Sequence, residues 1–207
     1  MYQKITVLFL LLLSLNVQGQ EEDLFRSIKA ETQIDESLLP DRMVFTQSLL
    51  WGERGLMRKT GWSPLTIEQR EKELKIRRKM LKLHQLIGYV TLAGMVTQGI
   101  LGTKLYEGRS RYYDTHKTIG NLTSISYFTG AGLSLFAPPP LTNKKQKGLS
   151  SIKAHKYLAT LHFSAMVATN VLAEKNRRLH RAAAFTAFGT YATAILVQQF
   201  FPLELVL

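Results

Sequence analysis

Four apolar segments of about 20 residues dominate the second half of the chain and constrain its fold more than any other feature. They cover residues 84–104, 116–136, 154–173 and 180–200. A helix rises about 1.5 Å per residue, so each segment is long enough to cross a hydrocarbon core of about 30 Å. The connections between them are short and polar, which favours antiparallel neighbours. We therefore predict an all-α membrane protein, a four-helix transmembrane bundle over residues 83–207.

A soluble four-helix bundle is the structural alternative. Each helix of such a bundle needs a charged stripe facing water. The stretches Gln85–Thr103 and Thr118–Pro140 contain no charged residue at all, which favours the membrane interpretation. The near-neutral mean hydropathy of the whole chain, −0.04, arises because a polar segment balances the apolar second half.

The N-terminus has the pattern of a secretory signal peptide. Lys4 precedes an apolar core, Ile5–Leu15, and the small residue Gly19 marks the expected cleavage point. Residues 1–19 are therefore predicted to be a signal peptide, with an uncleaved anchor as the alternative. In both cases the segment that follows emerges on the exported side of the membrane, which in a bacterium is the inner membrane.

Residues 20–82 are polar and charged, and we expect them to form an exported helical segment. Aromatic and aliphatic residues lie among the charges of 43–62, which indicates a short helix that packs on the bundle or lies in the membrane interface. A lid over the edge of a cofactor is the alternative. Farther along, Ser63 or Thr66 is the expected N-cap of a charged helix that runs directly into the first apolar segment.

Composition excludes several classes of function. The chain has no cysteine, so disulfides, thiolate-bound iron–sulfur clusters and covalently attached c-type haem are excluded. The net charge of +12 raises the possibility of nucleic-acid binding. The basic residues, however, cluster just outside the apolar segments, where lipid head groups attract them. We expect the lipid bilayer, and no nucleic acid, as a partner.

Each apolar segment begins with a histidine that is followed, four residues later, by glycine or alanine. Residues four apart lie on the same helical face. An imidazole with no side chain one turn deeper suits a flat, bulky ligand, although small residues also serve close helix–helix contact. The four pairs are His84 with Gly88, His116 with Gly120, His155 with Ala159, and His180 with Ala184.

The antiparallel order places these histidines in two pairs at opposite faces of the membrane. His84 and His155 are expected at one face, and His116 and His180 at the other. This layout suits two haem b groups per chain, each held non-covalently between two imidazoles that bind the iron.

Glycines near the far ends of the first two segments lie at the depth of the opposite histidine pair, where a macrocycle would pass. They are Gly99, Gly102, Gly130 and Gly132. Basic residues beside the histidines would neutralise haem propionates or contact lipid phosphates. These are Lys82, Lys117, Lys156 and Arg181.

A fifth histidine offers an alternative ligand. His162 follows His155 by seven residues, which places it about 10 Å deeper in the same helix. We assign the ligand to His155 because its depth and its i+4 alanine match the other three histidines. His162 would then line the space between the two haems.

The motifs "HQLIG", "HKTIG", "HKYLA" and "HRAAA" resemble the transmembrane dihaem cytochromes of the cytochrome b561 type, over about residues 82–201. The resemblance implies four consecutive helices with one haem ligand each, the first paired with the third and the second with the fourth. These are the pairs already expected from topology. The family usually has six spans, whereas four are predicted here, and no ascorbate-site motif is present.

The predicted function is a haem-binding protein that moves single electrons between the two membrane faces. We expect it to be more an electron conduit than a catalyst, because imidazoles would fill both axial positions of each iron, with a transmembrane oxidoreductase subunit as the alternative. The redox donor and acceptor, whether quinol, small reductant or partner protein, are not specified by the sequence. The alternative is a haem-free membrane protein, either an assembly factor or scaffold or a small-ion transporter, with histidines at the membrane interface.

Overall fold

The computed structural model describes residues 38–141 and 150–200. The chain divides into two compact units, 1–38 and 39–207, and every helix described below belongs to the second. The predicted signal peptide lies outside the described residues. Within the described ranges all regular structure is helical, which confirms the prediction of an all-α fold.

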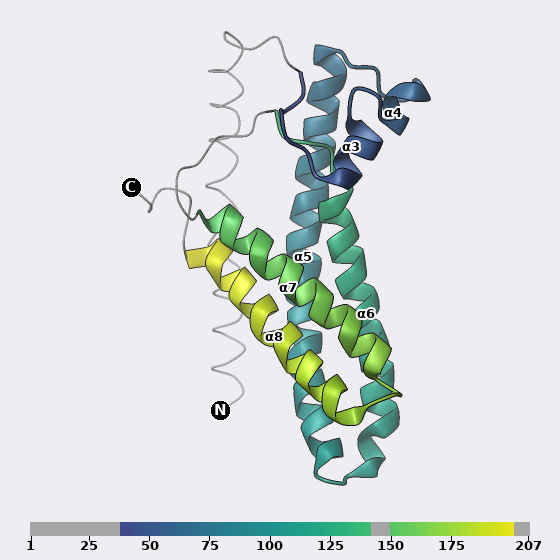
Figure 1. The fold of residues 1–207 in the computed structure, drawn as a ribbon, viewed down its shortest axis with the longest axis vertical. Helices are drawn as coiled ribbons and strands as arrows, with labels where there is room; N and C mark the ends of the chain where they lie inside the picture. Colours follow the sequence, from purple (N-terminus) through teal and green to yellow (C-terminus); the bar gives the residue numbers. More distant parts are fainter. Residues whose placement is uncertain (1–37, 142–149, 201–207) are drawn as a thin grey trace. The chain divides into compact units, whose positions relative to one another are not determined.

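The described part of this unit contains two short α-helices and four long ones, which Figure 1 shows. The charged helix that was expected to run into the first apolar segment is confirmed, because α5 is one continuous helix of 40 residues. The elements are α3 (Phe45–Trp51), α4 (Leu56–Lys59), α5 (Ile67–Tyr106), a 3₁₀ turn (Ser110–Tyr112), α6 (Tyr113–Leu135), α7 (Ser151–Leu172) and α8 (Arg177–Phe200).

Local side-chain hydrogen bonds define where three of the long helices begin. Of the two residues expected to cap α5, Thr66 does so, and its hydroxyl accepts a hydrogen bond from Gln69 N at 3.3 Å. Ser150 caps α7 in the same way, through Lys153 N. The side chain of Asn176 accepts from two backbone amides in the first turn of α8. Such caps satisfy amide groups that have no partner within the helix.

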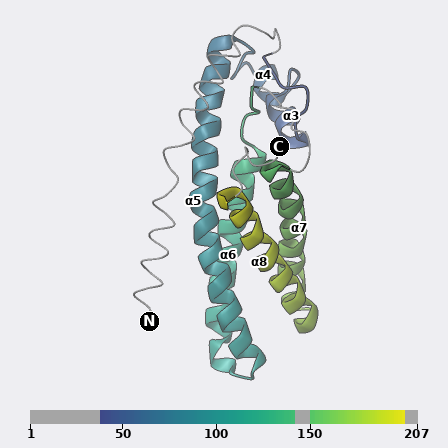
Figure 2. The same ribbon diagram turned by 90° about the vertical axis from the view of Figure 1, so that its left-hand side faces the viewer.

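The four long helices form two antiparallel hairpins, α5 with α6 and α7 with α8. In Figures 1 and 2 the α7–α8 pair is inclined to the α5–α6 pair. The hairpins meet chiefly where α8 packs on α5. There Tyr191 donates to the carbonyl of Gly88 at 3.2 Å, and Gln199 donates to the hydroxyl of Tyr89.

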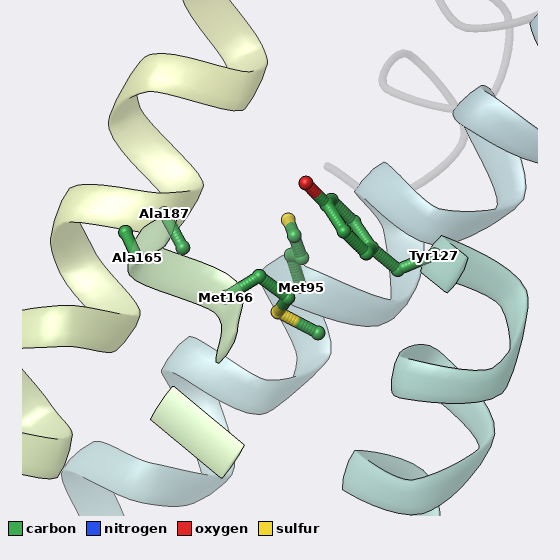
Figure 3. Close-up of a cluster of buried hydrophobic side chains, with 5 residues drawn as sticks. All are labelled: Met95, Tyr127, Ala165, Met166 and Ala187. Carbon is green, nitrogen blue, oxygen red and sulfur yellow. The ribbon is translucent and has the colours of Figure 1, made fainter. Parts of the chain in front are cut away.

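A small core joins all four long helices (Figure 3). Its side chains are few and mostly small or flexible, and Phe188 and Tyr191 pack against them. The large apolar side chains of the same helices point outward. The core consists of Met95, Tyr127, Ala165, Met166 and Ala187.

The short helix α3 packs on the end of α6. The hydroxyl of Thr46 donates to the carbonyl of Leu135 at 2.5 Å, and the indole of Trp51 donates to that of Phe136 at 3.0 Å. The last carbonyls of a helix have no partner within it, so these two side chains supply one. Of the two roles predicted for residues 43–62, this contact supports packing on the bundle.

A buried charge cluster joins α4 to the start of α5. Glu73 is fully buried and binds Arg58, Arg70 and Ser63. Burial alone would raise the pKa of Glu73, but hydrogen bonds from these three side chains outweigh it and hold the pKa below the usual value of 4.5. Charges are retained in this interior because each finds a partner.

The same cluster fixes the proline-rich turn that follows α6. Arg70 donates to the carbonyls of Pro139 and Pro140 at 3.1 and 3.3 Å, and Arg77 donates to that of Pro138 at 2.7 Å. Burial, and then the nearby charge of Arg70, lower the pKa of Arg77. The prolines have no amide proton, so they offer only carbonyls to this site.

Among the described residues one helix, α5, is long and apolar enough to cross a membrane. Its most apolar stretch has a mean hydropathy of 1.3, and only 22% of that stretch is buried. The other long helices fall below the same measure because threonine, serine and terminal cations dilute their apolar residues.

Candidate functional site

All four predicted histidines lie on the long helices and are partly buried. His84 lies within α5, where the charged half of that helix gives way to the apolar half. The other three lie in the first two turns of their helices, as the sequence predicted. His116 lies near the start of α6, His155 near that of α7 and His180 near that of α8.

Three of these histidines direct Nδ1 to a backbone carbonyl of the antiparallel neighbour. The distances are 2.8 Å from His84 to Gly130 O, 2.8 Å from His180 to Thr169 O, and 3.4 Å from His155 to Ala194 O. A carbonyl oxygen only accepts, so Nδ1 must donate its proton in each contact. The Nε2 atom of each neutral ring is then left with a free lone pair, which is the arrangement found in metal-binding histidines.

His116 has a different environment. Its Nδ1 atom is buried and has no hydrogen-bond partner among the described residues. Its ring lies against Gly102 of α5, where an added Cβ would be 3.2 Å from Cε1 of the imidazole. The backbone carbonyl of His116 accepts from the side chain of Gln98 at 3.0 Å.

The structure brings the members of one predicted pair toward each other. The rings of His116 and His180 have centroids 6.3 Å apart and are nearly perpendicular, at 85°. The pairing of the second with the fourth apolar segment is therefore compatible with the packing, and the pairing of His84 with His155 stays a prediction.

The glycines one turn below the histidines accept close approach from neighbouring helices. A Cβ added at Gly88 would be 3.5 Å from the hydroxyl of Tyr191, and one at Gly120 would be 3.4 Å from Oε1 of Gln98. The equivalent Ala159 lies partly buried on α7. These contacts are of the kind that helix packing requires. A role of these positions, and of Ala184, beside a macrocycle stays a prediction.

Two of the four far-end glycines lie directly against a histidine of the partner helix. Gly102 contacts His116, and Gly130 contacts His84, whose Nδ1 would be 3.9 Å from an added Cβ. The contacts are reciprocal within the α5–α6 hairpin, since each helix supplies one histidine and one glycine. The sequence placed these glycines at the correct depth.

His162 lies deeper than the others and in a different kind of site. It is 8% exposed, and its Nδ1 is 2.6 Å from the hydroxyl of Tyr127. Its ring also packs edge-on against Tyr191, with centroids 4.9 Å apart. Sequence reasoning missed both tyrosines. The missed signal is spacing, because each follows the histidine that begins its helix by eleven residues.

That spacing extends to a repeat between the two hairpins. His116, Tyr127 and Gly130 on α6 have the same spacing as His180, Tyr191 and Ala194 on α8. On the first helices, Met95 follows His84 by eleven residues, as Met166 follows His155. Met95 and Met166 are both buried, as are Gly130 and Ala194, whereas Tyr127 is buried and Tyr191 is partly buried.

Equivalent residues of the two hairpins also meet one another. The rings of Tyr127 and Tyr191 have centroids 5.7 Å apart, and His116 and His180 are in ring contact. Equivalent residues of the two hairpins thus face one another across the interface between them. Each predicted haem pair therefore consists of two equivalent histidines.

Comparison with known proteins adds no assignment. Neither a family model nor a curated protein nor a solved structure matches this chain. The described residues contain no group of three or more histidine, cysteine, aspartate or glutamate side chains that could hold a metal ion. A haem iron takes only two ligands from the protein, so that result concerns other kinds of metal site.

Proposed function

We propose that this chain is a membrane protein that binds two haem b groups and carries single electrons between the membrane faces. His84 and His155 would hold one haem, and His116 and His180 the other, as in the cytochrome b561-type arrangement. The observation that carries the proposal is the set of three Nδ1 contacts to backbone carbonyls. They leave Nε2 free on three of the four histidines that we assign to the two pairs.

The separation of His116 and His180 supports the fit of a metal between them. Two imidazoles on opposite sides of one metal ion, with metal–nitrogen bonds of about 2 Å, have ring centroids about 6 Å apart. The observed separation is 6.3 Å. Gly102 supports the same fit, because any side chain there would press on the His116 ring.

The residues of the chain would orient and tune these ligands. A hydrogen bond from Nδ1 to a carbonyl fixes the direction of the ring and makes Nε2 a stronger ligand. A haem with two imidazole ligands exchanges single electrons and has no open position for oxygen. The surrounding helices would keep water from the ligands, and their small residues would let the backbone approach closely.

The outward faces of the long helices support insertion in a membrane. Large apolar side chains are exposed along all four, among them Val90, Ile125, Leu161 and Leu196. A soluble monomer rarely exposes so extended an apolar surface.

Several polar side chains on those faces make their hydrogen bonds within their own helix. Exposed threonine and serine hydroxyls donate to the carbonyl four residues earlier, so they need no water. The residues are Thr97, Thr103, Thr160, Ser164, Thr186 and Thr193.

Haem stoichiometry tests the proposal. The chain is to be expressed in a host that supplies haem, extracted from the membrane fraction with detergent and purified, and haem is then assayed against protein mass. The expected result is two b haems per chain with a reduced-minus-oxidised spectrum of a low-spin cytochrome. Folded, membrane-extracted protein without haem would overturn the proposal, and one haem per chain would overturn one of the two pairs.

One observation favours a second candidate, a haem-free scaffold or small-ion transporter. Polar side chains meet at the centre of the bundle, where His162 binds Tyr127 and packs on Tyr191. Ionisable groups at such depth often mark an ion or proton path. Membrane-inserted, haem-free protein that collapses a proton gradient across vesicles would favour this candidate, with His162→Leu as the variant that should stop it.

A further inference from the structure

The bundle end formed by the α5–α6 and α7–α8 turns carries an excess of positive charge. Residues 104–117 contain four Lys or Arg and two Asp or Glu, and residues 174–181 contain four and one. Two of the three acids are already paired. Glu107 lies 3.3 Å from Arg109, and Glu174 lies 3.1 Å from Lys117. The remaining cations of this end have no carboxylate partner among the described residues.

Two of these cations are held over one aromatic ring. The guanidinium of Arg181 lies 4.0 Å from the centroid of Tyr106, and that of Arg177 lies 5.4 Å from the same centroid. Arg177 also donates to the backbone carbonyl of Leu105. The two arginines are one turn apart on α8, so α5 supplies a platform that orients both.

A second tyrosine repeats the arrangement on the α5–α6 turn. Lys104 and Arg111 lie 4.7 and 4.9 Å from the centroid of Tyr112, and Arg111 donates to its hydroxyl at 2.9 Å. That hydrogen bond, with the nearby positive charges, lowers the pKa of Tyr112. The local field at this end therefore favours negative charge.

The opposite end uses buried arginines differently. There Arg58 and Arg70 bind Glu73, and Arg77 binds the carbonyl of Pro138, so these cations hold the fold together. At the turn end, Arg177 and Arg181 are exposed. They also lie at the positive end of the α8 dipole, with no acidic residue in its first turn. This end of α8 therefore favours the approach of an external anion.

We propose that this end binds the head groups of anionic phospholipids, with Arg177 and Arg181 above Tyr106 as the phosphate-binding pair. The choice of lipid follows from position, because these residues lie where the proposed spans end. Exposed Tyr106 and Tyr113 at the same level are typical of a membrane–water interface. This inference rests on the proposed membrane insertion and does not depend on haem.

The test measures which lipids the purified chain retains. Detergent-solubilised protein is incubated with equal amounts of phosphatidylglycerol and phosphatidylcholine, and bound lipid is counted by native mass spectrometry. The wild-type chain is expected to retain phosphatidylglycerol preferentially. A cation near anionic lipid contributes enough that each arginine lost should weaken binding about fivefold. The double variant Arg177→Gln, Arg181→Gln should therefore lose most of the preference, as should Tyr106→Leu.

Arg178→Gln provides the matched control. Arg178 carries the same charge in the same helical turn, but among the described residues it contacts no aromatic ring, so its loss should change the preference least. Circular dichroism and membrane fractionation would show that each variant folds and inserts.

Equal retention of the two lipids would overturn the inference. So would an Arg178→Gln effect as large as that of the double variant, complete competition by inorganic phosphate, or a requirement for a co-purified acidic protein. A chain that never enters the membrane fraction would overturn the proposed function as well, whereas an inserted, haem-free chain that prefers phosphatidylglycerol would overturn only the haem proposal.

Discussion

The α5–α6 and α7–α8 hairpins share one plan and differ at its centre. In both, a histidine begins each apolar segment, a methionine follows the first histidine by eleven residues, and a tyrosine follows the second by eleven. The methionines and Tyr127 lie in the core, and Tyr191 packs against it. The shared positions are those that build the interface between the hairpins.

The difference lies seven residues after the first histidine of each hairpin. There α5 has Thr91 and α7 has His162. Thr91 shares a hydrogen bond of 2.8 Å with Ser126 of its own hairpin, whereas His162 is bound by Tyr127 of the other hairpin. The two tyrosines thus cross to equivalent positions of the other hairpin, where Tyr127 meets a histidine and Tyr191 meets Thr91 and the carbonyl of Gly88. The two hairpins therefore share the residues that build their interface, and they differ at the position seven residues after the first histidine.

The largest effect should come from breaking the predicted histidine pairs. His84→Ala and His155→Ala should each abolish the same haem, and His116→Ala and His180→Ala the other, so every single variant retains one haem per chain. The reason is that an iron with one imidazole missing loses half of its protein ligands. Haem content and low-temperature spectra of each purified variant provide the measurement.

His162→Ala is the control within that series, since it should leave two haems in place. Loss of a haem in this variant, with haem retained in His155→Ala, would move the ligand to His162. Loss of both haems from any single variant that still folds would contradict the assignment of separate pairs.

The second effect concerns the buried charge cluster that stabilises one end of the α5–α6 hairpin. The described part of the α7–α8 hairpin has no equivalent cluster. Glu73→Ala leaves Arg58 and Arg70 buried without a carboxylate, and should lower the free energy of unfolding by about 3–5 kcal/mol. Chemical denaturation in detergent measures it. Because the folded-state pKa of Glu73 is lowered below 4.5, its contribution is complete at neutral pH and is lost as the pH falls below 4.5 through the folded-state pKa.

Arg177→Gln is the control for that variant. It removes an exposed cation and should change the free energy of unfolding by less than about 1 kcal/mol, the usual limit for surface charges. Similar destabilisation by both variants would show that the cluster does not brace the hairpin. So would a difference in free energy of unfolding between wild type and Glu73→Ala that does not shrink as the pH falls below 4.5.

The third effect separates the two crossing tyrosines. Tyr127→Phe removes the hydrogen bond between the Tyr127 hydroxyl and buried His162 and should lower the free energy of unfolding by about 1–3 kcal/mol, the penalty of an unsatisfied buried group. Tyr191→Phe removes a bond to Gly88 O and a side-chain contact with Thr91, and should cost about 0.5–1.5 kcal/mol because that carbonyl lies inside a helix and Thr91 keeps its bond to Ser126. Thermal unfolding of the two variants gives the comparison, and an equal or inverted order would mean that the hairpins do not differ at their centre.

The smallest effect tests whether the glycines make α5–α6 different from α7–α8. Gly88→Ala introduces the residue found at the equivalent Ala159, and its Cβ would meet Tyr191 at an ordinary 3.5 Å. Helix propensity favours alanine by about 1 kcal/mol, so this variant should be neutral or slightly stabilising. The Cβ of Gly102→Ala would lie 3.2 Å from Cε1 of the His116 ring. This close contact should offset the stability gained from helix propensity. Unfolding midpoints that fall equally in the two variants would refute the distinction.

The sequence by itself determined the helices and much of their ends. Hydrophobic stretches free of charge predicted four segments that coincide with α6, α7, α8 and the second half of α5, and Thr66 was one of two expected caps. These features depend on hydrogen bonds and apolar residues a few positions apart, so they can be predicted before any tertiary contact is known. The position of His116, His155 and His180 near helix starts, and of Gly102 and Gly130 at the depth of their partners, follows from the same local rise of the helix, whereas His84 lies in the middle of α5.

Only the tertiary structure decided which groups meet. The polar residues Arg70 and Glu73 belong to a segment that composition marks as exposed, yet α4 and the proline-rich turn bury them. The Nδ1 partner of His84 lies 46 positions away, and that of His155 lies 39 positions away. Tyr127 and His162 are 35 positions apart. Such contacts depend on how the two hairpins pack against each other. That packing results from many small side chains together, and no local pattern in the sequence determines it.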